Sequence, residues 1–112
     1  MSLRVQMRRA LTEAMRARDR NAVNALRATL AAVDNVEAVP LDEVELSAVA
    51  DGPVRAGTTE VARRELDDEA VAGIVRAEAD ERLAAAAQLS AAAQEDRAAR
   101  LRAEADVLAG LL

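Results

Sequence analysis

The chain has 112 residues, a net charge of −5 and no aromatic, cysteine or histidine residue. This length allows one domain, and the missing side chains exclude disulfides, a typical zinc site and a histidine-dependent catalytic triad. Hydrophobic residues make up 52% of the chain, and about half of them are alanine, the strongest helix former. The composition therefore predicts a small all-α domain without catalytic residues, metal or cofactor.

The first helix is expected to begin after Ser2, a candidate N-cap, and to break near Arg18. Its apolar residues recur every three or four positions, which is the helical spacing: Leu3, Met7, Ala10, Leu11 and Ala14. No apolar run there has the length of a signal peptide or of a membrane span, so we expect a cytoplasmic protein that does not bind membranes.

Asp19 is positioned to cap a second helix, which would form a hairpin with the first. The apolar stripe of this helix consists of Val23, Leu26, Leu30 and Val33. Pro40 disfavours helical geometry at Val39, so the helix is expected to end at Glu37 or Ala38. Residues 39–65 then contain two prolines and two glycines without helical periodicity, and they predict one long loop that is either mobile or functional.

Residues 66–112 predict a pair of helices that packs on the hairpin as a small bundle. The third helix should begin near Asp67 or Asp68, whose carboxylates suit the positive end of the helix dipole. Its apolar stripe consists of Val71, Ile74, Val75, Ala85 and Leu89. The alanine-rich run that follows carries little information on packing, and a break is expected between Ala92 and Asp96. The last apolar stripe consists of Leu101, Ala105, Leu108 and Leu112.

Charged residues interrupt these stripes. Glu78 and Arg82 lie on the apolar line of the third helix, and Glu104 interrupts the fourth stripe in the same way. Arg27 flanks the stripe of the second helix. Because a buried charge without a partner costs several kcal/mol, we expect Arg27, Glu78, Arg82 and Glu104 to form a structural ion network. A functional polar groove is the alternative, although carboxylates without histidine are a weak basis for acid–base or metal chemistry.

The charges are unevenly distributed along the chain. Residues 1–37 hold seven arginines and four acids, a net charge of +3, whereas the remainder holds eight arginines and sixteen acids, a net charge of −8. The predicted solvent face of the hairpin and its corner carry a basic ridge of Arg8, Arg9, Arg16, Arg18 and Arg20. Such a ridge either keeps the hairpin soluble and balances acids elsewhere or contacts the phosphates of a structured RNA.

Three segments resemble the GatB/YqeY family. They are MRARDRNAVNALRATLAAVDNVEAV from Met15, LDDEAVAGIVRAEADERLAAAAQL from Leu66 and DRAARLRAEADVLAGLL from Asp96. The segments occur in the family's order at workable spacing, and the resemblance covers about 85 residues. The residues that match its motifs are Leu26, Arg27, Asn35, Glu37, Glu78, Arg82 and Glu104.

The resemblance implies an all-helical protein related to the tail region of the GatB subunit in the tRNA-dependent amidotransferase, a tail that contacts tRNA. The family label is a carbon-nitrogen ligase with glutamine as amide donor. Full-length members continue past the fourth helix with a further small helical domain, so this chain is expected to be a short form. It offers no residues for an ATP site or for ammonia production.

We therefore expect a non-catalytic accessory module that binds tRNA weakly. With few arginines and a net charge of −5, its affinity at physiological salt should be about micromolar at best. The alternative is a helical module that buries an apolar face against a protein partner or a second copy, with no role in RNA binding.

Overall fold

The computed structural model describes the backbone of residues 1–49 and 65–112 and the side chains of residues 1–38 and 65–112. This part of the chain contains no strand, and it forms α1 (Leu3–Ala17), α2 (Arg20–Val49), α4 (Asp68–Ala87), the short 3-10 helix η1 (Ala92–Gln94) and α5 (Glu95–Ala109). The predicted all-α fold class is confirmed.

Local side chain to backbone bonds define the corner between α1 and α2. The Ser2 hydroxyl accepts a hydrogen bond from the backbone N–H of Val5 at 3.1 Å and caps α1. The helix ends at Arg18, which adopts the left-handed conformation with φ 57°. Asp19 follows directly, and its carboxylate accepts a hydrogen bond from the N–H of Ala22 at 3.1 Å. Two residues thus reverse the chain, as the sequence predicted.

The second helix extends beyond the predicted end. It passes Pro40 and reaches Val49, so the prediction that it ends at Glu37 or Ala38 and that a loop begins at Val39 is wrong. Proline disfavours the helix but removes only one backbone donor. Residues 41–49 contain no glycine or further proline and are mostly good helix formers, so they continue the helix. The rest of the expected loop, up to residue 64, lies outside the described residues.

The third predicted helix begins as expected. The Asp67 carboxylate caps α4 by accepting a hydrogen bond from the N–H of Ala70 at 2.8 Å. Asp68 accepts one from the N–H of Leu3 at 3.1 Å, which joins the starts of α1 and α4. However, α4 ends at Ala87, before the break predicted between residues 92 and 96. Successive alanines have the same helix propensity, and no side chain among them marks an end.

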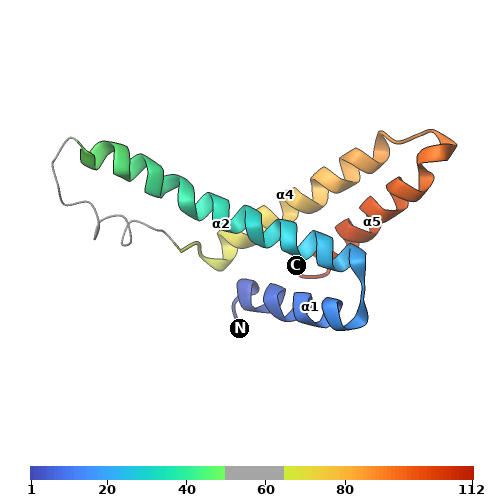
Figure 1. Ribbon diagram of the computed structural model, residues 1–112, viewed down its shortest axis with the longest axis horizontal. Coiled ribbons are helices and arrows are strands. Elements are labelled where there is room, and N and C mark those ends of the chain that lie inside the picture. Colours follow the sequence, from blue (N-terminus) through green and yellow to red (C-terminus); the bar gives the residue numbers. More distant parts are fainter. Residues whose placement is uncertain (50–64) are drawn as a thin grey trace.

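The described residues form two helical hairpins (Figure 1): α1 with α2 and α4 with α5. α2 packs against all three other helices, and α1 also contacts α4. Their shared core consists of Leu3, Met7, Ala14, Ala22, Ala25, Leu26, Val33, Val71, Val75, Ala79, Ala105 and Leu108. Two predicted stripe residues, Ala85 and Leu112, are exposed instead. Ala86 is buried in place of Ala85, a shift of one position in the alanine run.

None of the helices in the described part of the chain combines the length and the hydropathy that crossing a membrane requires.

Candidate nucleic-acid interface

A hollow of about 510 Å³ opens beside the corner between α1 and α2. The lining combines apolar, amide and cationic side chains and includes no carboxylate: Met15, Arg18, Arg20, Val23, Asn24 and Arg27. A volume of this size lies within the range of binding pockets for small organic molecules. The hollow therefore has the dimensions of a binding site and a lining of one sign of charge.

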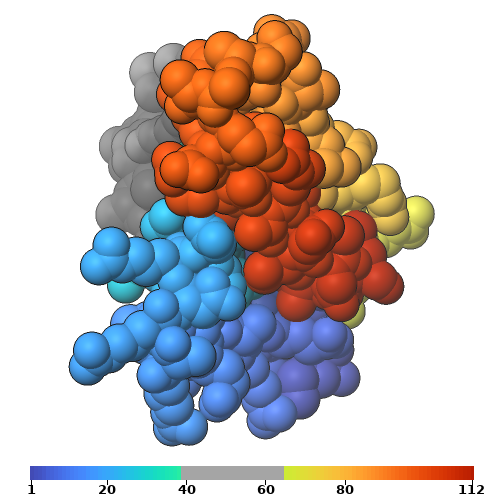
Figure 2. All heavy atoms as spheres, turned by 90° about the vertical axis from the view of Figure 1, so that its right-hand side faces the viewer, coloured from blue at the N-terminus to red at the C-terminus, as the bar shows by residue number. Residues whose placement is uncertain are grey.

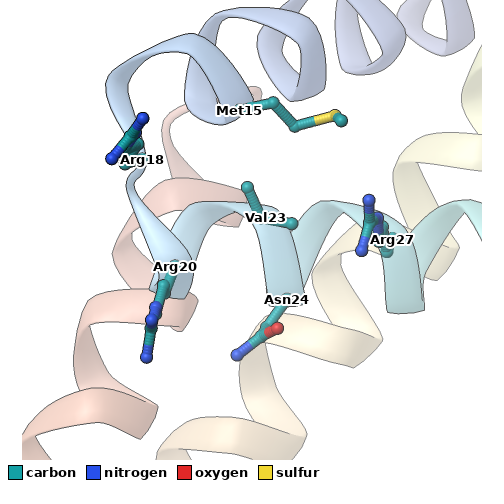
Figure 3. A pocket seen from close by; sticks show the side chains of 6 residues that line it. All are labelled: Met15, Arg18, Arg20, Val23, Asn24 and Arg27. Carbon is teal, nitrogen blue, oxygen red and sulfur yellow. The ribbon is translucent and has the colours of Figure 1, made fainter.

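Figure 3 shows how the two helices arrange these side chains. Met15 extends from α1 over the space between the helices, and Val23 points toward it from α2. Arg27 stands on the same side of α2 as Val23, while Arg18 lies at the opposite end, at the corner itself. The hollow thus has an apolar middle with a guanidinium at either end.

Two of the arginines occupy backbone positions that are unfavourable for an arginine side chain. Arg18 holds a left-handed conformation that favours glycine. Arg20 is the first residue of α2, where the positive end of the helix dipole disfavours a cation. The acids nearest in sequence are already engaged, because Asp19 caps α2 and Glu13 pairs with Arg16 at 3.3 Å. Asp19 keeps its own negative charge, so the three arginines of the lining leave the corner positive, but by less than their number alone implies.

All five arginines of the predicted basic ridge are exposed. The structure brings Arg18 and Arg20 together at the hollow, whereas Arg8, Arg9 and Arg16 lie along α1 outside its lining. Figure 2 shows light-blue side chains of the corner projecting from the molecule into open space. Sequence reasoning missed Met15, Val23 and Asn24 as neighbours of these cations, because their proximity depends on the angle at which the hairpin closes.

The charged residues on the inner faces of α4 and α5 meet as an ion triad of Glu78, Arg82 and Glu104. Arg82 Nε donates a hydrogen bond to Glu104 Oε1 at 2.8 Å, and Arg82 Nη1 donates one to Glu78 Oε1 at 3.1 Å. The three side chains are only 13–23% exposed. Burial lowers the pKa of Arg82, but the hydrogen bonds that Arg82 donates to Glu104 and Glu78, together with the attraction of their negative charges, outweigh it and leave that pKa raised. The triad joins α4 to α5.

Arg27 does not belong to this triad, contrary to the prediction. It lies on the exposed side of α2, at the hollow. Its position flanks the buried stripe of Ala22, Leu26 and Val33, and this places the side chain at the end of the hollow away from the corner rather than against α4 and α5. The fourth predicted member of the network is thus part of the candidate interface.

A second buried ion pair was not predicted from the sequence. Arg4 of α1 binds the carboxylate of Glu37, which is 5% exposed and also accepts a hydrogen bond from the N–H of Leu66 at 2.8 Å. Arg4 also pairs with the exposed Glu65 at 3.2 Å. The only sequence signal that singled out Glu37 was the expected resemblance of its segment to the GatB/YqeY family. The pair attaches the chain that leads into α4 to the first hairpin.

The described side chains contain no group of three His, Cys, Asp or Glu residues that is close enough to hold a metal ion. The triad consists of carboxylates bound to a guanidinium, without a hydroxyl or thiol nucleophile among its hydrogen-bond partners. Its arrangement suits structural stabilisation.

Comparisons of this chain with protein-family models, with curated proteins and with solved structures found no match.

Proposed function

We propose that this chain is a non-catalytic accessory module that binds the phosphate backbone of structured RNA, in particular tRNA. The observation that carries the proposal is the hollow at the α1–α2 corner, whose lining includes three exposed arginines and no acid. A guanidinium is planar and carries donors that match phosphate oxygens in pairs, so arginine is well suited to this contact.

The number of arginines sets the expected strength of binding. The three at the hollow and the three along α1 neutralise few phosphates, and the rest of the chain is acidic. Binding should be about micromolar and should weaken steeply as salt is added, because phosphate contacts release condensed counterions. Without aromatic side chains, base stacking of the usual kind is not available.

The resemblance to the GatB/YqeY family supports tRNA as the RNA. The segment that carries it, residues 15–39, includes all six residues that line the hollow. In the family this hairpin belongs to proteins related to a tRNA-binding tail. The module would thus assist an amidotransferase-type enzyme, while the carbon-nitrogen ligase activity itself would belong to other subunits.

The test is the affinity for bulk tRNA, measured by fluorescence anisotropy at several salt concentrations. In the corner variant, Arg18, Arg20 and Arg27 are each changed to Gln. In the control variant, the exposed Arg76, Arg97 and Arg100 are changed to Gln, which removes the same charge elsewhere.

The corner variant should lose most of its affinity, and the slope of log affinity against log salt should fall by about one for each phosphate contact removed. The control should behave as wild type apart from a small general loss, and both variants should keep their helical circular dichroism. Equal losses in the two variants, or no binding by wild type in low salt, would contradict the proposal. Salt-insensitive self-association on gel filtration would then favour the helical interaction module.

A further inference from the structure

The hollow differs from a surface that contacts only phosphates in having an apolar middle. Met15 is half exposed, and Val23 points toward it from the facing helix (Figure 3). A ligand that covers both side chains removes their apolar surface from water, which favours binding. A phosphate group offers no such surface, so the apolar middle is unused if the corner binds backbone alone.

The positions of the cations indicate what shape of ligand fits. Arg18 and Arg27 stand at opposite ends of the hollow with the apolar middle between them (Figure 3). A ligand that contacts both arginines and the apolar middle at once carries a flat apolar part flanked by anionic groups. An unpaired nucleotide has this structure, since its base is flanked along the strand by two phosphates.

The volume agrees with this size class. About 510 Å³ is within the range of pockets that hold small organic molecules. In a paired duplex the faces of the bases are covered by their neighbours, whereas an unpaired nucleotide can present its face to a protein. Apolar side chains can hold such a displaced base by contact with its faces.

We propose that the hollow receives one unpaired nucleotide of the bound RNA, with its base between Met15 and Val23 and its flanking phosphates on Arg18 and Arg27. This inference rests on the proposed RNA-binding function and narrows its substrate class to RNA with an unpaired loop or end. Met15 and Val23 then determine the preference for unpaired RNA, and the arginines supply the affinity common to all RNA.

The experiment compares two RNAs with the same number of phosphates, one a blunt duplex and the other a duplex interrupted by a short unpaired loop. Both are titrated at one low salt concentration with wild-type protein and with Met15→Ala. The control is Leu83→Ala, because Leu83 is a large apolar residue of similar exposure on α4, outside the hollow.

Wild type should prefer the looped RNA by about fivefold, the scale expected when a base covers part of one methionine side chain. Met15→Ala should lose most of this preference while it retains its affinity for the duplex, and Leu83→Ala should keep the preference. Equal binding of the two RNAs by wild type, or an undiminished preference in Met15→Ala, would overturn the inference and leave backbone binding intact. Failure to bind either RNA would overturn the proposed function as well.

Discussion

At the scale of single residues, Arg82 allows two charged glutamates to lie on the inner faces of a helix pair, because it binds both of them. Each of its two carboxylate partners is held by a separate nitrogen, Nε for Glu104 and Nη1 for Glu78. The raised pKa of Arg82 means that its contribution to stability is fully present below the pKa of the unfolded state. Since that pKa is already that of an arginine, Arg82 itself should add no pH dependence to stability from acidic to mildly alkaline conditions.

Removing the guanidinium leaves two partly buried carboxylates without a cation. Arg82→Met should therefore lower the free energy of unfolding by about 2–3 kcal/mol, less than for a fully buried pair because the glutamates keep some hydration. Arg102→Met is the matched control, since Arg102 pairs with Glu95 in an exposed position on the same hairpin and should cost less than about 1 kcal/mol. Urea denaturation of both variants measures the difference. Similar small losses would show that the triad contributes little.

The buried carboxylate of Glu37 supplies a second test with a shared partner. Arg4 binds both Glu37, which is 5% exposed, and Glu65, whose side chain is 84% exposed. Glu37→Gln should destabilise the protein by about 2–3 kcal/mol, because a buried charge-assisted bond is lost and Arg4 keeps only an exposed partner. Glu65→Gln should change stability by less than about 1 kcal/mol. A larger effect of Glu65→Gln in thermal denaturation would contradict this assignment.

The ion triad and the Arg4–Glu37 pair differ in how far the sequence could predict them. Glu78 and Arg82 are four residues apart on one helix, so helical geometry alone places them together, and Glu104 follows from the same interrupted stripe. Arg4 and Glu37 are separated by 33 positions, and their contact depends on how the hairpin closes. No periodicity within a single helix contains that information.

At the scale of elements, short side chains at helix ends determine the corner that carries the proposed interface. Asp19→Ala removes the carboxylate that caps α2 and should cost about 1 kcal/mol, the usual value of an N-cap. Asp34→Ala, at an exposed interior position of the same helix, is the control and should be nearly neutral or slightly stabilising, because alanine has the higher helix propensity. Equal melting temperatures for the two variants would show that the cap does not stabilise the corner.

Helix starts were predictable because Ser2, Asp19 and Asp67 each supply a side-chain acceptor for a specific backbone N–H. Helix ends were less predictable from the sequence. At Pro40 a local penalty competes with the propensity of the residues on both sides, and the longer helix results. In the alanine run, the end of α4 at Ala87 is marked by no change in propensity. Both errors concern ends that lack a distinctive side chain.

At the scale of the whole molecule, the positive charge is concentrated near the α1–α2 corner and the second hairpin is acidic. Residues 1–37 of the first hairpin carry a net charge of +3 and the hollow, but α2 continues to Val49 and residues 42–45 add three acids, so this hairpin as a whole holds seven arginines and seven acids. Residues 65–112 hold five arginines and eleven acids, and they contain the ion triad that joins α4 to α5. α2 connects the two hairpins, because it packs on both α1 and the second hairpin. The all-α class and the exposed arginines followed from composition and periodicity, whereas the hollow depends on the closure of α1 on α2 and was not predictable.

This distribution of charge predicts where RNA should bind. The arginines that line the hollow, Arg18, Arg20 and Arg27, are exposed to solvent. Arg76, Arg97 and Arg100 are exposed in the acidic part of the chain. An RNA backbone should approach the first group and avoid the second, because the surrounding acids repel it.

The most direct measurement is an NMR titration of the protein with tRNA in low salt, observed at the Nε–H groups of the arginine side chains. Shifts or broadening confined to Arg18, Arg20 and Arg27, and reversed by added salt, are the predicted result. Unchanged signals at the corner, or equal changes at Arg76, Arg97 and Arg100, would contradict the assignment of the α1–α2 corner as an RNA-binding surface.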